Sequence, residues 1–223
     1  MRIALLDERL RFPDPRQADE DGFVAVGGDL AVDRLLLAYR SGIFPWTVAP
    51  VTWWSPDPRG IFELNRFHVS RSLARTIRQS VFRVTFDEAF RAVMEGCAAP
   101  APGRRSTWIT REFIDSYTEL HRQGHAHSVE CWAAGGQLVG GVYGVALGGF
   151  FAGESMFHRA SNASKVALFH LVQHLRQGGF ELFDIQMLTP ITEQLGGITI
   201  SRAEYLKRLA RAVEKRVAFR VRA

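Results

Sequence analysis

The sequence contains little cysteine and no long apolar run. Its 223 residues include 2 cysteines, Cys97 and Cys131, which are too few for a disulfide framework and fit a reducing compartment. No stretch approaches the roughly 20 apolar residues that a bilayer span needs, and a charge at Asp7 comes too early for a secretory signal. We therefore expect a cytoplasmic, monomeric protein without a membrane partner.

Metal-ligand spacings are also scarce. His170 and His174 stand four residues apart in an expected helix, but no Glu of the metalloprotease type lies between them. His125, His127 and Cys131 do not match a metal-ligand spacing either. The sequence therefore predicts neither a metal site nor a cofactor.

Positive charge is in modest excess. The formal net charge is +5, in a composition of 47% hydrophobic and 23% charged residues that is otherwise close to globular averages. Basic proteins gain affinity for polyanions because neutralised phosphates release counterions. By itself this favours a polyanionic partner only weakly.

The chain divides into two regions that differ in composition and in their helical and strand patterns. Residues 1–65 are dense in proline, glycine and tryptophan and contain one clear helical pattern, at 33–40, with Gly42 just past its end. Residues 66–223 show regular helical and strand patterns. We expect a small, loop-rich N-terminal domain followed by a larger domain.

The larger region predicts an α+β fold. Helices are expected from a cap at Ser70, from a cap at Asp87 to about Glu95, from Thr110 to Gly124, at about 164–177, and from a capping box at Ser201. Strands are expected at 81–86, 128–132, 138–145, 150–154 and 181–188, with glycine pairs turning three of them into an antiparallel meander. This order indicates a mostly antiparallel sheet flanked by helices.

A basic ridge follows the helix that begins at Ser70. Arg71, Arg75 and Arg78 recur at i, i+4 and i+7 on one side of this helix, and Arg66 and Arg83 lie nearby in the sequence. Such a ridge is either a solvated helix face or a contact surface for phosphates. The pattern alone leaves both readings open.

One expected strand carries a polar pair. Because side chains alternate along a strand, Asp184 and Gln186 project from one face and Phe183 from the other. Buried polar groups need partners, so the pair either meets a ligand or satisfies internal hydrogen bonds. Glu154 stands at a strand end, where sheets often offer ligand-binding groups, although an exposed structural Glu fits the same pattern.

Two tryptophans stand where an indole can stack on a base. Trp46 follows Pro45, and Trp108 lies shortly after the basic pair Arg104–Arg105. Indoles near such turns can stack on nucleobases or anchor the core of a loop-rich domain. Ser155 lies in part of a serine-hydrolase elbow, but the closing glycine is absent, which disfavours a nucleophilic serine.

Eight short motifs occur in order along nearly the whole chain. They are GGDL at 27–30, GIFPW at 42–46, WWSPDPR at 53–59, TWIT at 107–110, GHAHS at 124–128, GESMF at 153–157, NASK at 162–165 and DIQ at 184–186. Together they closely resemble the bacterial leucyl/phenylalanyl-tRNA–protein transferase family. The resemblance implies a small N-terminal domain, residues 1–65, and an acetyltransferase-like (GNAT-like) catalytic domain, residues 66–223.

The resemblance also implies roles for individual residues. Asp184 and Gln186 match the family's catalytic pair. From the chemistry of the reaction we expect Gln186 to orient the acceptor amine and Asp184 to polarise that contact or receive the proton through water, with a vicinal ribose hydroxyl as the alternative proton carrier. The implied substrate-binding residues are Trp46 and Trp108 for the aminoacyl-adenosine end, Glu154, Ser155 and Met156, and an apolar pocket of Val142, Phe151, Leu171, Leu175 and Phe183. Given a tRNA partner, we also expect Arg71, Arg75, Arg78, Ser164 and Lys165 to contact the tRNA.

The implied reaction moves Leu or Phe, and Met more weakly, from aminoacyl-tRNA to the N-terminal Arg or Lys of acceptor proteins. Within the family this marks the acceptors for degradation by the N-end rule pathway. One alternative is an acetyl-CoA-dependent acetyltransferase, but residues 158–163 before the central helix lack the glycines of a pyrophosphate loop. Another is a non-catalytic tRNA-binding module, for which Asp184 and Gln186 would be dispensable.

Overall fold

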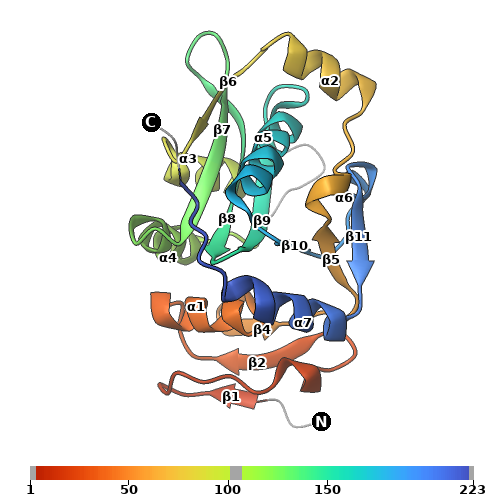
Figure 1. The fold of residues 1–223 in the computed structure, drawn as a ribbon. Helices are drawn as coiled ribbons and strands as arrows, with labels where there is room; N and C mark the ends of the chain where they lie inside the picture. Colours follow the sequence, from red (N-terminus) through yellow and green to blue (C-terminus); the bar gives the residue numbers. More distant parts are fainter. Residues whose placement is uncertain (1–3, 101–106, 221–223) are drawn as a thin grey trace.

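Two β-sheets form the framework of the protein (Figure 1). The computed structural model describes residues 4–100 and 107–220, so the basic pair Arg104–Arg105 lies outside the described residues. The smaller sheet has the order β1-β2-β4-β3, built from β1 (Ala4–Leu6), β2 (Phe23–Gly27), β3 (Phe44–Val48) and β4 (Val51–Trp54). The larger sheet has the order β11-β5-β10-β9-β8-β7-β6.

The larger sheet is antiparallel except at one pair. Its strands are β5 (Arg59–Phe62), β6 (Arg83–Phe86), β7 (Ala126–Trp132), β8 (Leu138–Leu147), β9 (Phe150–His158), β10 (Leu182–Gln186) and β11 (Gly197–Ile200). Strands β9 and β10 run parallel, and a parallel pair needs a crossover, which helix α5 (Ala163–Gly178) supplies. The predicted α+β class with a mostly antiparallel sheet flanked by helices is confirmed.

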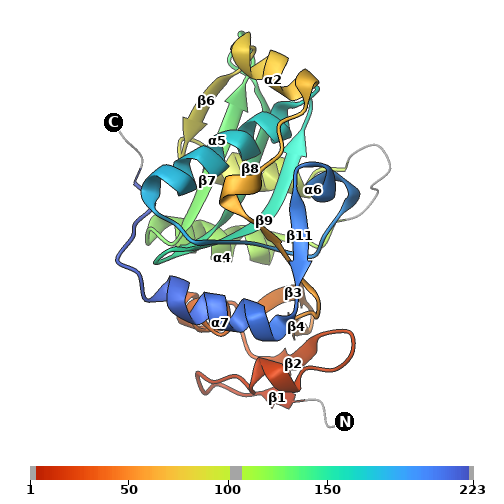
Figure 2. The ribbon, with the colours of Figure 1, turned by 45° about the vertical axis from the view of Figure 1, so that its right-hand side comes forward.

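Helices cover both faces of the larger sheet. Helix α5 packs on one face, while α3 (Phe90–Ala98) and α4 (Arg111–Arg122) pack on the other (Figures 1 and 2). Helices α1 (Val32–Arg40) and α7 (Arg202–Val213) lie at the junction with the smaller sheet, and α2 (Arg71–Arg78) lies at the opposite end of the molecule. Short helical turns occupy Pro15–Gln17, Leu64–Arg66 and α6 (Pro190–Gln194). Within residues 4–100 and 107–220, no helix is both long and apolar enough to cross a bilayer.

The N-terminal region is more regular than its sequence suggests. Strands β1 to β4 are only 3 to 5 residues long, and two of them contain Gly27 or Pro45, so they leave no clear alternating pattern. Strand β5 falls within residues 1–65 but pairs with β10 and β11 of the larger sheet. Leu35 and Trp53 share one buried cluster with Phe113 and Tyr143, so the two regions have a common core.

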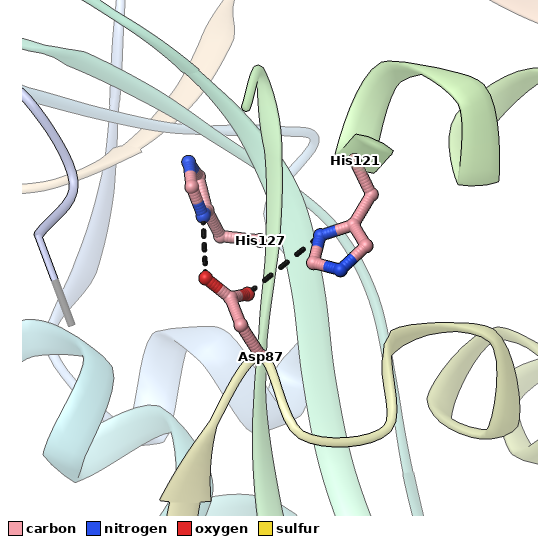
Figure 3. A group of neighbouring side chains, drawn as sticks. All are labelled: Asp87, His121 and His127. Carbon is pink, nitrogen blue, oxygen red and sulfur yellow. Dashed lines mark hydrogen bonds and ion pairs between the residues drawn. The ribbon is translucent and has the colours of Figure 1, made fainter. Parts of the chain in front are cut away.

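Two predicted helix caps form and one does not. The Ser70 hydroxyl accepts from the Leu73 N–H at 3.3 Å, and the Ser201 hydroxyl accepts from the Glu204 N–H at 3.2 Å. The second half of the predicted capping box does not form, because the Glu204 carboxylate accepts from Arg208 instead. Helix α3 instead starts at Phe90, because the Asp87 carboxylate is engaged elsewhere, which corrects the predicted cap. The Asp87 carboxylate accepts a hydrogen bond from His127 Nδ1 at 2.7 Å (Figure 3). It also accepts one from the Ser128 N–H at 2.8 Å.

Candidate active site

A cavity of about 240 Å³ opens where the middle of β9 and the end of β10 approach strand β3. Because β9 runs on to His158, Glu154 lies within the strand and not at the strand end expected from the sequence. Its lining consists of Phe44, Pro45, Trp46, Trp108, Glu154, Ile185, Gln186, Met187 and Thr189. Four of the predicted site residues, Trp46, Trp108, Glu154 and Gln186, therefore line one cavity although they come from separate parts of the chain. This cavity is the candidate active site.

Two indoles form one part of the lining. Both Trp46, on β3, and Trp108, just before α4, are partly buried. Trp46 packs edge-on against Trp54 with ring centroids 5.4 Å apart, and Trp108 packs edge-on against Phe113 at 5.2 Å. Each indole is thus fixed by another aromatic ring while part of its surface remains available for a ligand to stack on.

Gln186 is held in an unusual backbone conformation at the end of β10. Its φ is +55°, a left-handed value that costs a non-glycine residue about 1–3 kcal/mol unless its surroundings enforce it. The Asp184 carboxylate accepts the Gln186 backbone N–H at 2.9 Å, and the Gln186 side-chain amide donates to Glu154 Oε1 at 3.0 Å. Glycine at position 60 is also required, since a Cβ there would lie 2.8 Å from the Met187 carbonyl carbon.

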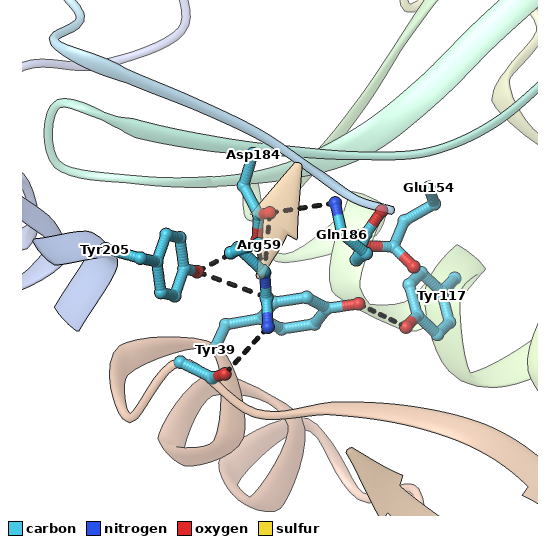
Figure 4. Close-up of polar contacts among 8 residues, drawn as sticks. Tyr39, Arg59, Tyr117, Glu154, Asp184, Gln186 and Tyr205 are labelled. Atoms are coloured by element: carbon cyan, nitrogen blue, oxygen red, sulfur yellow. Dashed lines mark hydrogen bonds and ion pairs between the residues drawn. The ribbon is translucent and has the colours of Figure 1, made fainter. Parts of the chain in front are cut away.

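Asp184 is 0% exposed and does not line the cavity. Its carboxylate accepts from Arg59 Nε at 2.8 Å, from Arg59 Nη2 at 2.7 Å and from the Tyr205 hydroxyl at 2.9 Å (Figure 4). Burial lowers the pKa of Arg59, but the Asp184 carboxylate more than offsets this effect, so the guanidinium stays charged. Asp184 therefore reaches the cavity only through Gln186, and its anchors Arg59 and Tyr205 were not assigned from the sequence.

Glu154 is the extra residue in a β-bulge of β9 opposite Tyr143 and Gly144. The bulge aims its partly buried side chain at the cavity, beside the hydrogen-bonded hydroxyls of Tyr39 on α1 and Tyr117 on α4 (Figure 4). Burial raises the pKa of Glu154 to about 8, although a hydrogen bond from Tyr39 opposes the shift. Glu154 can therefore gain or lose a proton near neutral pH.

Comparison with known protein families identifies this arrangement. The model described as leucyl/phenylalanyl-tRNA protein transferase matches residues 61–210, and the model of the N-terminal domain of the same family matches residues 28–57. The chain belongs to this family. The predicted resemblance is confirmed, and so is the class of enzyme, because family members transfer an aminoacyl group from tRNA to protein.

Curated relatives match over almost the whole chain. A leucyl/phenylalanyl-tRNA–protein transferase of Anaeromyxobacter sp. (strain K) is 51% identical over 218 residues, covering 96% of this chain and 93% of the relative. The transferase of the same name from Shewanella sp. (strain W3-18-1) is 49% identical over 210 residues, covering 92% and 89%.

The solved structures to which the chain shows some similarity are more distant. The structure of L-PGS from Bacillus licheniformis is 12% identical, with a TM-score of 0.45, and covers 83% of this chain and 71% of its own. A tandem GNAT protein from the clavulanic acid biosynthesis pathway is 14% identical, with a TM-score of 0.36, and covers 74% and 54%.

The five residues expected to hold the transferred side chain pack together but do not line the cavity. Val142, Phe151, Leu171, Leu175 and Phe183 are all buried in the core between α5 and the larger sheet. Two further side chains, Ile185 and Met156, pack against this cluster, and Ile185 also lines the cavity. Ile185 therefore contacts both the cavity and the cluster. Ser155 is partly buried opposite Tyr143 and lies outside the lining.

The predicted tRNA-binding residues lie away from the cavity. Arg71, Arg75 and Arg78 are all exposed on α2. Near the start of α5, Lys165 is partly exposed, whereas Ser164 is only 5% exposed. The ridge thus offers three free-standing positive charges at one end of the molecule.

Asp87, His121 and His127 form a group whose possible metal-ligating atoms lie within 4.8 Å of one another (Figure 3). The Nδ1 atoms of His121 and His127 each have a hydrogen-bond partner within the protein. His127 Nδ1 donates to Asp87, and His121 Nδ1 lies 2.8 Å from the Ala126 carbonyl oxygen. The geometry is therefore that of a hydrogen-bonded group that ties the loop before α3 to the start of β7.

A larger groove, of about 820 Å³, lies between α5 and α7. It contains none of the predicted site residues. Its charges are mixed, since Arg208 pairs with Glu63 and Glu204. It has no polar group aimed at a reacting centre comparable with the Gln186–Glu154 pair.

Proposed function

We propose that this chain transfers Leu or Phe, and Met more slowly, from aminoacyl-tRNA to the N-terminal Arg or Lys of acceptor proteins in the cytoplasm, marking them for degradation by the N-end rule pathway. The observation that carries this proposal is the single cavity lined by Trp46, Trp108, Glu154 and Gln186 in a chain of this family. Such a cavity combines surfaces for a nucleoside with polar groups for an amine.

The donor is already activated. An ester between an amino acid and the terminal ribose needs no ATP or covalent enzyme intermediate, so the protein has to position a neutral amine and stabilise the oxyanion that develops. Trp46 and Trp108 would hold the terminal adenosine, and the Gln186 amide would orient the amine. Asp184 would act as a positioning residue, because its carboxylate holds the Gln186 backbone N–H.

The transferred side chain would enter the apolar cluster of α5. Ile185 contacts both this cluster and the cavity, so we expect the transferred side chain to pass this residue. An apolar pocket separates similar hydrophobic groups only weakly, by about 1–3 kcal/mol per methylene, but it excludes charged ones. Leu, Phe and Met would share the pocket, and shape would disfavour β-branched Ile and Val.

The cationic acceptor suits the charge of the cavity. Among the described residues that line it, Glu154 carries a carboxyl group and none carries a positive charge. The acceptor end arrives with an α-ammonium group and a basic side chain, and both gain from a nearby carboxylate. An acidic N-terminal residue would gain nothing comparable.

Transfer assays test the proposal. Purified protein is given tRNAs charged with radiolabelled Leu, Phe, Met or Ile, together with peptides that start with Arg, Lys or Asp. We expect label in the Arg and Lys peptides from Leu and Phe, less from Met, and little from Ile. Absence of transfer from Leu-tRNA and Phe-tRNA to both basic peptides would refute the proposed function.

A further inference from the structure

The Asp184 carboxylate has no free acceptor position for a proton from the substrate. A carboxylate offers about four acceptor positions, and four donors occupy them: Nε and Nη2 of Arg59, the Tyr205 hydroxyl and the Gln186 backbone N–H. Arg59 cannot give up its proton, and the carboxylate is 0% exposed. Another group must therefore receive the proton that the acceptor amine loses.

Glu154, unlike Asp184, is placed where it can contact the substrate. It lines the cavity directly, and its Oε1 accepts the Gln186 side-chain amide that is proposed to orient the amine. An amine held by Gln186 would therefore lie next to this carboxyl group. The titratable and charged groups around Glu154 are Tyr39 on α1, Tyr117 on α4, Tyr143 on β8, Arg59 on β5 and Asp184 on β10.

We propose that Glu154 is the general base of the reaction and takes the first proton from the α-ammonium group of the acceptor. This inference rests on the proposed function. The proton moves to a Glu154 oxygen, and the neutral nitrogen then attacks the ester carbonyl carbon, forming the N–C bond. The C–O bond to the ribose breaks, and the second proton passes from the attacking nitrogen to the departing ribose oxygen. Glu154 finally releases its proton to water.

The acid–base match supports this assignment. An α-amino group has a pKa of about 7.7–8.0, and burial raises the pKa of Glu154 to about 8. Transfer between two groups of similar pKa is close to thermoneutral, which is the efficient range for a general base near neutral pH. A carboxylate of ordinary pKa would be a poorer acceptor.

The test compares two acceptors that differ in whether they need a base. Both peptides start with Arg, but in one the α-amine is replaced by a hydrazine, which is already neutral at pH 7. Single-turnover transfer from Phe-tRNA is measured at saturating peptide for the wild type and for Glu154→Gln, which keeps the shape of the side chain. We expect the variant to lose about 100-fold or more with the amine and to stay close to the wild type with the hydrazine.

Raising the pH supplies a second readout. The defect of Glu154→Gln with the amine peptide should shrink as the pH passes the amine pKa of about 7.7–8.0, because the neutral amine then forms without help. The matched control is Tyr205→Phe, which removes one hydrogen bond to Asp184. It should slow both acceptors by a similar factor at every pH, because it disturbs position and not proton transfer.

Two results would overturn the inference. If Glu154→Gln slowed the hydrazine peptide as much as the amine peptide, Glu154 would bind or position substrate instead of taking a proton. If the variant matched the wild type with the amine, the base would lie elsewhere. Unchanged affinity for Phe-tRNA would show that the variant is folded. A wild type inactive with both peptides would contradict the proposed function itself.

Discussion

At the scale of single residues, Glu154 makes stability depend on pH. Its pKa of about 8 lies above that of an exposed Glu, about 4.3, so the folded state binds more protons than the unfolded state between these values. Stability should therefore fall as the pH rises through this window. We expect the melting temperature of the wild type to drop relative to Glu154→Gln from about pH 4.3 to 8, by about 2–4 °C per kcal/mol. If the difference in melting temperature between the wild type and Glu154→Gln stayed constant across this pH range, the raised pKa would be contradicted.

Substitutions of Asp184 and Gln186 should differ in how much they lower the stability of the protein. Asp184→Asn weakens the neutralisation of buried Arg59 and should cost about 3–5 kcal/mol of stability, whereas Gln186→Ala removes a side chain that faces the cavity. Each should lower transfer at least about tenfold, since misplacing a reacting group by about 1 Å can cost about 100-fold. Denaturant unfolding and single-turnover rates measure the two effects. Near-normal transfer by both variants would remove the pair from the mechanism.

Sequence motifs predicted the residues that line the cavity better than those that support them. Trp46, Trp108, Glu154 and Gln186 all lie in the recognised motifs. Arg59 ends the motif at 53–59 but received no role, because its partner Asp184 is 125 residues away in the sequence. Tyr39, Tyr117 and Tyr205 stand on the buried sides of helices, where a pattern of apolar spacing treats a tyrosine as another hydrophobic residue.

At the scale of secondary-structure elements, helix α2 presents the candidate tRNA contact. We expect charge reversal at Arg71, Arg75 and Arg78 to weaken tRNA binding and to lower the salt slope of log K by at least about 3. Binding should stay similar for tRNAs with different anticodons, because phosphates carry no sequence information. The matched control reverses three arginines on the N-terminal segment, Arg9, Arg11 and Arg16. Equal losses in the two triple variants would reduce the ridge to a solvated helix face.

The contact between α5 and the larger sheet should set side-chain preference. Val142→Phe adds volume to a site that is 4% exposed, and overpacking costs about 1–3 kcal/mol. We expect Phe transfer to fall more than Leu transfer when both charged tRNAs compete at equal concentration. The ratio of products is independent of how much enzyme is folded. An unchanged ratio would place Val142 outside the pocket.

Element boundaries failed where side chains or strain override local pattern. The strand expected at 181–188 ends as β10 at Gln186, where the φ of +55° breaks the extended conformation. The helix expected to begin after Asp87 starts at Phe90, because His127 and Ser128 engage the Asp87 carboxylate. The Gln186 side chain bonds to Glu154 and the Asp87 carboxylate to His127, which are 32 and 40 residues away in the sequence, so no local pattern could predict these contacts.

At the scale of the whole molecule, the two regions act as one unit. The smaller sheet and the α3–α4 face of the larger sheet share a hydrophobic core, and the cavity takes Trp46 from one region and Gln186 from the other. We propose that the boundary lies before Arg59, since β5 belongs to the larger sheet and the two family models meet between 57 and 61. Composition and the family resemblance both predicted the two-part organisation, but the shared core depends on long-range packing.

The most direct test of this account is the structure of the protein bound to a non-hydrolysable amide analogue of phenylalanyl-adenosine. We expect the adenine to stack on Trp46 or Trp108, the carbonyl to lie beside Gln186 and Glu154, and the phenyl ring to pass Ile185 into the cluster of Val142, Phe151, Leu171, Leu175 and Phe183. An analogue bound in the larger groove between α5 and α7, with the 240 Å³ cavity empty, would contradict the central claim.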